Sequence, residues 1–474
     1  MSRPSRAESL RRVLQDIMYY KSGVAGLLLI TLLVALSIYT VIALPVDRAI
    51  YLWRSSEIWL DNPRTAAPEW VQFFVGRELP KTVVLDSRAA RLGVAKSSTP
   101  IFGTNMKKIL IEFSFEYSYD DFPSEVNVFL NAKAAKQLPV LKVIWVKPSG
   151  DAITLIETMM SGPNMSLYVT ASEHVLRNMV GYVTAKFGFL PSDRCTQLRL
   201  LFGQYTPDAL RTGDMVIEKG RYRLIIDATV FDEQDDLDAK LVVYGLVHGI
   251  AGTDHLRRPL EIALLWGAPV ALAFGLTASL VTSLVQMIIA TIGAYYGGLL
   301  DSLIQRITEI YMVLPFLPFL IMISVFYQVN IWVILVVVIV LSIFGGGIKS
   351  TRALVMQIKE YPYIEAARTY GASNMRIIFL YIIPKILPPI VPGLISAVPG
   401  FVFLEAALAF LGLGDPLLPT WGKVINDAFE NGAVYKGYYY WVLEPSALLI
   451  LTGIAFALFG FALDRIVNPR LREL

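Results

Sequence analysis

Long apolar runs alternate with charged stretches along this chain and divide it into parts of two kinds. An uncharged run at 23–44 is long enough to cross a bilayer as a helix. Five more apolar runs follow toward the C-terminus, at about 264–293, 310–328, 331–348, 387–411 and 442–463. The pattern therefore predicts an α-helical polytopic membrane protein with six transmembrane helices.

Residues 45–255 follow a different pattern, in which charges of both signs return and apolar positions alternate with polar ones. Alternation with a period of two is typical of strands, and it runs through residues 109–117 and 222–230. The segments 141–146 and 152–159 flank a turn rich in Pro, Gly and Asp and predict a hairpin. We therefore expect a β-rich domain inserted between the first and second transmembrane helices.

One helix is predicted inside this β-rich domain. Ser172 is a suitable N-cap residue, because its side-chain oxygen can accept a hydrogen bond from the first turn. Val175, Met179, Val180 and Val183 then recur at helical spacing. These four side chains form the apolar face of the expected helix.

Basic residues set the expected orientation of the spans, because lysine and arginine collect in cytoplasmic loops. Residues 1–22 are basic and carry apolar side chains at helical spacing, which predicts an amphipathic helix on the inner membrane surface. Span one at 23–44 then leads to an extracellular domain at 45–255. Spans two to six lie in 256–474, which includes a cytoplasmic loop at 349–386. This order predicts a multi-pass protein of the plasma membrane with both termini in the cytoplasm.

Composition supports a membrane protein and argues against several kinds of site. Of the 474 residues, 55% are hydrophobic and 17% are charged, which is too apolar for a soluble protein of this size. The single cysteine, Cys195, allows no intrachain disulfide, and the three histidines lack the spacing of metal ligands. No basic run predicts binding to nucleic acid, and the net charge is only +3. We expect this chain to have no catalytic residue and to bind no cofactor or metal.

The cytoplasmic loop has the features of a docking segment. Pro362 disfavours helix at Tyr361, so a helix is expected to begin after this break. Glu365 would lie in the first turn, where the helix dipole favours an acid. Small or apolar residues then follow the helical period in one narrow stripe: Ile364, Ala367, Gly371, Met375 and Ile378. Such a helix fits a groove on a partner, with a bend allowed at the glycine, or it packs only on its own bundle; the sequence leaves both interpretations open.

This loop resembles the EAA loop of ABC-importer permeases, through Glu365-Ala366-Ala367, Gly371 and the ending Tyr381-x-Ile383-Pro384. In that family the loop forms the coupling helix, which sits in a cleft of the ATPase subunit. The usual ending is Ile-x-Leu-Pro, so two residues differ here, while the break at the proline is retained. The resemblance implies contact with an ATPase through these residues: Ile364, Glu365, Ala366, Ala367, Gly371, Ala372 and Pro384.

The C-terminal half resembles one branch of these permeases, the dipeptide/oligopeptide (DppC/OppC-like) subunits. A Gly-Thr-Asp-x-Leu motif at 252–256 precedes the second span, as in the branch's Gly-Thr-Asp-x-Leu-Gly-Arg-Asp. Arg257 and Pro259 stand in place of its second glycine and second aspartate. The likeness covers residues 1–45 loosely and about 250–474 well. The inserted domain is far larger than the short loop typical of the branch.

The resemblance implies a permease subunit of an ABC importer that moves di/oligopeptides or similar solutes into the cell by alternating access. Its expected partners are a homologous second permease subunit, two cytoplasmic ABC ATPase subunits that bind ATP and Mg, an extracellular solute-binding protein and the lipid bilayer. Oligosaccharides and nickel complexes are alternative solutes. A membrane receptor with an extracellular ligand domain is an alternative from another class, although no cytoplasmic loop or tail is long enough for an output domain. An intramembrane enzyme would need a nucleophile–base pair or metal ligands within the spans, and we find neither.

Glu405 is an acid within an otherwise apolar predicted span. An intramembrane carboxylate usually faces the bundle interior or a water-filled path. Together with Phe401 and Phe410, it is expected to line the translocation pathway or its gate. The alternative is an interhelical hydrogen bond that positions span five.

Two further features lie near the inner membrane surface. Asp301, Arg306 and Glu309 occur at about helical spacing and predict an inner-face charge cluster. The resemblance implies a position near the coupling region; the alternative is an anchor for the helix ends. The run Gly345–Ser350 is not a phosphate-binding loop, because Ile348 separates its last glycine from the lysine.

Overall fold

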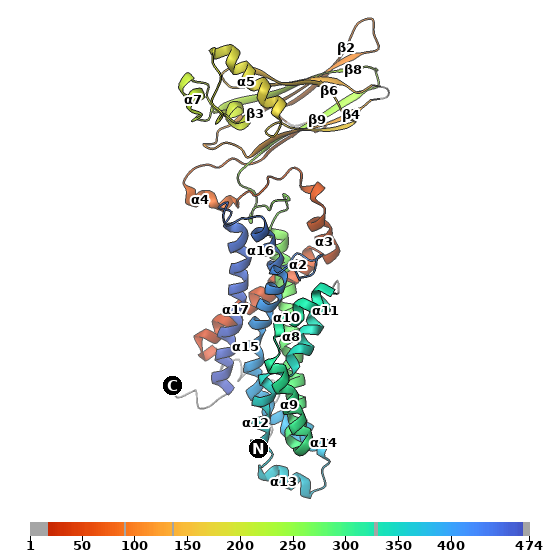
Figure 1. Cartoon of the computed structure of the whole chain (residues 1–474), viewed down its shortest axis with the longest axis vertical. Helices are drawn as coiled ribbons and strands as arrows, with labels where there is room; N and C mark the ends of the chain where they lie inside the picture. Colours follow the sequence, from red (N-terminus) through yellow and green to blue (C-terminus); the bar gives the residue numbers. More distant parts are fainter. Residues whose placement is uncertain (1–17, 90–91, 135–136, 327–329, 468–474) are drawn as a thin grey trace. The chain divides into compact units, whose positions relative to one another are not determined.

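The computed structural model describes residues 18–89, 92–134, 137–326 and 330–467. The chain forms two compact units, one made of residues 1–54 and 261–474 and the other of residues 55–260. The first unit is helical and the second is built mainly from strands (Figure 1). Most of the predicted amphipathic helix at 1–22 lies outside the described residues.

The helical unit contains the candidate membrane spans. Within the described residues, four helices are long and apolar enough to cross a membrane, and the number rises to six if each of two bent helix pairs is one span. The four are α2 (Lys21–Ala43), α8 (Glu261–Tyr296), α15 (Ile383–Phe410) with the short helical segments that precede it from Asn374, and α17 (Tyr440–Val467). The chain is therefore a helical membrane protein with four to six candidate spans.

The structure shows a bend within each of the predicted spans at about 310–328 and 331–348. The first region is divided between α9 (Gly298–Val313) and α10 (Phe316–Phe326), which are bent by 77° at Leu314. Leu314 is extended because Pro315 follows it, and a residue before proline disfavours the helical region.

A second bend separates the two helices that follow. Here α11 (Ile331–Ile343) and α12 (Gly346–Ile358) meet at 47°. Gly345 has an extended backbone and begins the new helix as its N-cap residue. Hydropathy alone did not reveal these bends, because the apolar runs continue across both of them.

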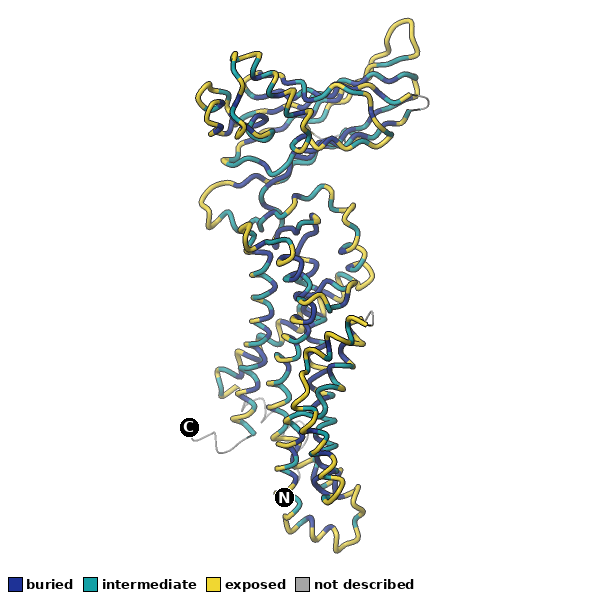
Figure 2. Tube along the Cα trace, in the orientation of Figure 1, coloured by how far each residue is buried: buried dark blue, intermediate teal, exposed yellow. Residues whose placement is uncertain are grey.

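The helices of this unit pack closely at small residues. A cluster of buried side chains joins α2, α8, α15 and α17 and includes Leu33, Leu272, Val402 and Phe456. Figure 2 shows that buried and exposed stretches alternate along the long helices. At Gly267 of α8, an added Cβ would lie 2.1 Å from the ring of Trp421, the first residue of α16 (Trp421–Glu430). The tryptophan therefore requires glycine opposite it, as is common where membrane helices approach closely.

The second unit contains two antiparallel sheets. One has the strand order β1-β9-β4-β7 and the other β2-β3-β8-β5-β6. The strands are β1 (Val83–Asp86), β2 (Val94–Pro100), β3 (Lys107–Tyr117), β4 (Glu125–Lys133), β5 (Val140–Val146), β6 (Ala152–Met159), β7 (Asn164–Tyr168), β8 (Gly220–Val230) and β9 (Asp236–Tyr244). Strands β3 and β8 pair along their whole length, and alternate side chains of both are buried in the core.

The predicted hairpin and the predicted helix of this unit are confirmed. Strands β5 and β6 pair as a hairpin with an irregularity at Val143/Ile144. Helix α5 (Glu173–Phe187) begins after Ser172, whose hydroxyl accepts a hydrogen bond from Val175 N at 3.4 Å. Three of the four predicted core side chains of this helix are buried, and the fourth is half-buried.

Short helical segments complete both units. They are α3 (Val46–Arg54), η1 (Ser56–Trp59), η2 (Glu69–Val71), α4 (Gln72–Val75), α6 (Gln197–Phe202), α7 (Pro207–Thr212), α13 (Pro362–Thr369), α14 (Asn374–Ile377) and η3 (Ile378–Ile382).

A charged side chain is fully buried in the β-rich unit. Lys147 lies with its Nζ 3.2 Å from Glu218 and 3.5 Å from the ring centroid of Tyr205, and it donates a hydrogen bond to Gly203 O. Asp151 is close by and is itself paired with a second lysine. Burial lowers the pKa of Lys147 to about 8, because the interior disfavours the charged form despite these partners.

Candidate functional site

The predicted docking helix is α13. Tyr361 has an extended backbone, and Pro362 occupies the first turn, where its missing N–H leaves no hydrogen bond unmade. The predicted break before this helix is confirmed. Glu365 lies in the first turn, as expected, and Thr369 Oγ1 donates to its backbone oxygen at 3.0 Å.

The two faces of α13 differ in burial. Ile364 and Ala367 are buried in an apolar cluster that also contains residues of α8, α14 and η3. Glu365 and Ala366 lie on the opposite, exposed face. The helix thus packs on its own bundle through one face, which is the second interpretation of the sequence. Its other face is open, as docking to a partner, the first interpretation, requires.

The predicted stripe on a single helix is wrong. Helix α13 ends at Thr369, and the chain turns at Gly371, whose φ of +77° lies in the left-handed region that glycine adopts without strain. Ser373 then caps α14, so the helical phase is reset. As a result Ile378 is buried with the cluster, whereas Met375 is exposed. The chain thus bends at the glycine, which the sequence had allowed.

The expected break at Pro384 is also wrong. The π-helix η3 leads directly into α15, and Pro384 occupies the first turn of α15. A proline at that position removes no hydrogen bond of α15, so the chain stays helical. Pro384 is exposed, and Ala372 is half-buried against the apolar cluster beneath α13.

Two residues that the sequence did not single out connect this site to α8. Tyr295 near the end of α8 hydrogen-bonds Asn374 of α14, with a distance of 3.0 Å between the hydroxyl and Oδ1. The guanidinium of Arg368 lies 5.2 Å from the ring centroid of the same tyrosine. Through Tyr295, α8 therefore contacts both α13 and α14 directly. No sequence signal predicts these pairs, because their members lie more than seventy residues apart.

The Gly-Thr-Asp motif at 252–254 forms a folded turn at the end of the β-rich unit. Thr253 Oγ1 donates to Pro63 O at 2.8 Å and accepts from Ala66 N at 3.0 Å. Asp254 accepts from the backbone N–H of Arg258 at 2.8 Å and pairs with that residue's Nε at 2.5 Å. The motif thus ties the chain segment before α8 to the segment around residue 65.

Arg257 lies in this turn and has a φ of +67°, which is in the left-handed region. Its side chain pairs with Glu125 at 2.6 Å, donates to Asn62 O at 2.6 Å and lies 4.2 Å from the ring centroid of Tyr244. The strained arginine therefore joins the turn to the strands β4 and β9.

Comparisons with known proteins match the C-terminal part of the chain. The family model described as "binding-protein-dependent transport system inner membrane component" matches residues 286–473. The dipeptide transport system permease protein DppC of Bacillus subtilis is 32% identical over 223 residues, which cover 47% of this chain and 69% of the relative. The chain belongs to this permease family.

Other members of the permease family are similar to the same part of the chain. The oligopeptide transport system permease protein OppC of Bacillus subtilis is 29% identical and matches 47% of this chain and 72% of the relative. The glutathione transport system permease protein GsiD of Pectobacterium atrosepticum is 28% identical, with 47% and 73% covered. The β-rich unit lies outside the range that the family model matches.

The predicted inner-face charge cluster of this permease is divided in two. Asp301 pairs with Arg352 of α12 through bonds of 2.6–3.0 Å. Arg306 and Lys349 instead approach Glu309, at 3.8 and 3.7 Å. The first pair joins α9 to α12 and is partly buried, whereas the second group is exposed and resembles an anchor for the helix ends.

The three predicted pathway residues pack against neighbouring segments. Glu405 is buried in α15 and has a hydrogen bond with Thr420, the N-cap residue of α16. Phe401 is half-buried against an apolar cluster, and the ring of Phe410 lies 5.4 Å from that of Phe429. The hydrogen bond with Thr420 agrees with the interhelical alternative for Glu405, and its place on the pathway stays a prediction.

The glycine run at 345–347 has a packing role. A Cβ at Gly347 would lie 1.9 Å from Oε1 of Gln286, a residue of α8. Gln286 donates to Ser342 O at 2.8 Å and so holds α8 against this bend.

Among the described residues, no group of three His, Cys, Asp or Glu side chains could hold a metal ion.

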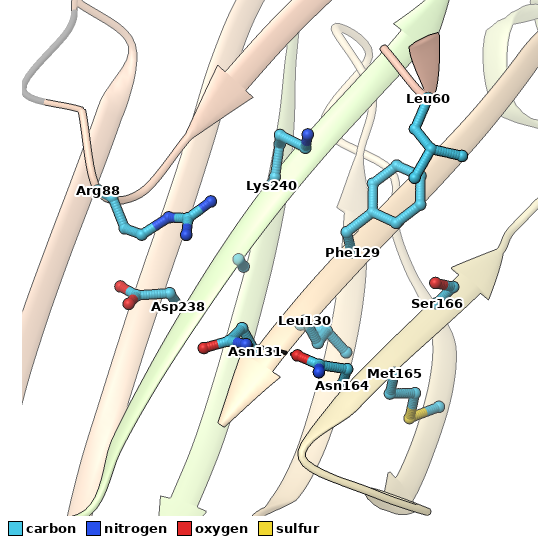
Figure 3. A pocket seen from close by; sticks show the side chains of 11 residues that line it. Leu60, Arg88, Phe129, Leu130, Asn131, Asn164, Met165, Ser166, Asp238 and Lys240 are labelled. Carbon is cyan, nitrogen blue, oxygen red and sulfur yellow. Dashed lines mark hydrogen bonds between the residues drawn. The ribbon is translucent and has the colours of Figure 1, made fainter. Parts of the chain in front are cut away.

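A shallow pocket lies on the face of the four-stranded sheet that is turned away from the core (Figure 3). Side chains of β4, β7 and β9 line it, among them Phe129, Asn164 and Lys240. Its polar groups bond to one another or to neighbours: Asn131 donates to Asn164, and Lys240 pairs with Asp61. We assign no ligand to this pocket.

Proposed function

We propose that this chain is a permease subunit of an ATP-binding-cassette importer that moves dipeptides or oligopeptides into the cell. The names of the related permeases support peptides, because they specify dipeptides, oligopeptides and glutathione. This support ranks peptides above oligosaccharides and nickel complexes as solutes. The proposed complex contains a homologous second permease, two cytoplasmic ATPase subunits that bind ATP and Mg, and an extracellular solute-binding protein.

The proposed topology has six spans with both termini in the cytoplasm of a plasma-membrane protein. Counting each bent helix pair as one span supports this number. The β-rich unit at 55–260 is then inserted between the first and second spans and lies outside the cell, where the solute-binding protein arrives. The basic residues of α12 and α13 support a cytoplasmic position for α13.

The two-faced burial of α13 is the observation that carries the proposed mechanism. Its exposed face carries the small side chain of Ala366, where an ATPase groove can approach the backbone closely. Its buried face packs on the spans, so that a displacement of the helix reaches α8 and α15. ATP binding in the partner subunits would close the ATPase dimer and move α13, which switches the pathway between its inward-facing and outward-facing states.

Substitutions on the exposed face test this proposal. Ala366 is exposed, so Ala366→Trp is expected to leave folding intact and to block seating of the helix in the ATPase. Uptake of a radiolabelled peptide should fall to background, and the ATPase should no longer co-purify. Glu365→Lys and Gly371→Asp are expected to have the same effect. Ala366→Ser is the matched control and should retain uptake; full uptake by the tryptophan variant would defeat the proposal.

A further inference from the structure

The β-rich unit carries an exposed apolar patch, here called the stem patch: Trp70, Phe73, Phe74, Val75 and Ile250. Phe73 and Phe74 are 87% and 83% exposed, and Ile250 is 78% exposed. Two adjacent phenylalanines that are almost wholly exposed are unusual on a soluble surface, where large apolar patches mark contact with a partner or a membrane.

The stem patch is held in place by hydrogen bonds. Glu69 N donates to Gly249 O at 2.9 Å, and Trp70 Nε1 donates to Ile250 O at the same distance. The rings of Trp70 and Phe74 meet edge to face, with centroids 6.0 Å apart. The exposed rings therefore project from an ordered helical turn that is bound to the segment around Gly249.

Chain connectivity places the stem patch close to a membrane span. Leu260 N donates to Gly252 O at 3.1 Å, and α8 begins at the next residue, Glu261. Ile250 is two residues before Gly252, so the backbone and this hydrogen bond allow at most about 18 Å between the Cα atoms of Ile250 and Glu261. The covalent connection therefore allows the patch to reach the lipid headgroups around this candidate span.

The side chains of the patch and its neighbours suit a lipid interface. Tryptophan is enriched where membrane proteins meet the headgroup layer, and phenylalanine fills the apolar face of interfacial segments. Arg77 and Lys81 flank the patch, and both side chains are about half exposed. Cations beside apolar side chains are typical of segments that lie in the interface.

We propose that the stem patch inserts into the outer headgroup region of the bilayer and anchors the base of the β-rich unit there. This inference rests on the proposed extracellular position of the unit. An anchored base restricts how far the unit can swing on its two connections to the spans. The occupant of the patch is therefore the lipid surface and not a protein.

A spin label at the patch tests this inference in the full chain, reconstituted into phosphatidylcholine vesicles. Cys195, the only cysteine, is replaced by serine, and Phe73→Cys carries the label. Phe102→Cys is the matched control, because Phe102 is fully exposed at the tip of the β2–β3 hairpin, away from the stem patch. The label at position 73 is expected to collide several-fold more often with oxygen than with a water-soluble nickel chelate. The control should show the reverse.

Three other results would overturn the inference or its basis. Equal access of the chelate to both labels would show that the patch faces water. A label at position 73 that neither reagent reaches would show that protein covers the patch. Failure of a membrane-impermeant maleimide to reach the control cysteine from outside would instead refute the extracellular topology. As a second measurement without cysteines, brominated lipids should quench wild-type tryptophan fluorescence more than that of Trp70→Phe.

Discussion

Arg257 offers a quantitative test of how the β-rich unit holds the turn before α8. Its left-handed backbone costs a residue other than glycine about 1–2 kcal/mol. Its side chain is almost fully buried and contacts Glu125, Asn62 and Tyr244. The strained conformation is stable only if these contacts contribute more than the strain costs.

Two substitutions separate the contacts from the strain. Removing one member of a buried ion pair costs about 3–5 kcal/mol, and the partly exposed Glu125 places Arg257→Ala at the lower end, about 3 kcal/mol. Arg257→Gly loses the same contacts but relieves the backbone, so its cost should be about 1 kcal/mol smaller. For a unit of this size, 1 kcal/mol corresponds to about 2–4 °C. The expected decreases in unfolding temperature are therefore about 6–12 °C for alanine and about 4–8 °C for glycine.

The assay is thermal unfolding of the full chain in detergent solution. Pulsed hydrogen exchange of peptides from β4 and β9 monitors the unfolding of the β-rich unit. Arg223→Ala is the control, because Arg223 forms an exposed pair with Glu112 at 3.3 Å, and such pairs contribute about 1 kcal/mol or less. A glycine variant as stable as the wild type would refute the reasoning, since the contacts would then contribute no more than the strain costs. Equal decreases in unfolding temperature for the alanine and glycine variants would show that the backbone of Arg257 is not strained.

Three further predictions follow from buried contacts. The pKa of Lys147 is lowered from 10.5 to about 8, so the unfolded state binds the proton of this side chain more tightly than the folded state. The free energy of unfolding of the β-rich unit should therefore rise by about 1 kcal/mol between about pH 7 and pH 9. Thermal unfolding of the Lys147→Met variant should lack this rise. Asp301→Asn should lower the free energy of unfolding of the helical unit by about 1–2 kcal/mol, which is measured as a lower unfolding temperature. In a variant that already carries Arg352→Gln, the same substitution should lower the free energy of unfolding by less. Gly267→Ala should displace the buried tryptophan ring of α16 and lower the free energy of unfolding, measured in detergent solution, by about 1–3 kcal/mol. Gly400→Ala should change this free energy little, because a Cβ at Gly400 meets open space.

Features that depend on neighbouring residues were predictable from the sequence. Period-two alternation identified β3 and β8, because each side of a strand meets one environment. Ser172 and Pro362 marked the starts of two helices, because their effect on the backbone is local. The candidate site was found for the same reason, since its small residues and its proline lie close together in the chain.

Features that depend on distant residues were not predictable. The partner of Asp301 is Arg352 of another helix, whereas the sequence grouped Asp301 only with Arg306 and Glu309. The stripe beyond α13 was misjudged because a periodicity argument assumes one continuous helix, while Gly371 turns the chain. The two bent helix pairs escaped detection because hydropathy measures composition and is insensitive to direction. The partly open face of α13 required coordinates, since only packing shows which small residues are covered.

Photocrosslinking from α13 tests the central claim most directly. Tyr370, directly after α13, is 91% exposed, and benzoylphenylalanine is a conservative replacement there. Tyr435, between α16 and α17, is 92% exposed and provides the matched control. The account predicts that the probe at position 370 crosslinks to a nucleotide-hydrolysing subunit of the purified complex and that the probe at position 435 does not. A crosslink to such a subunit from position 435, or none from position 370, would contradict it.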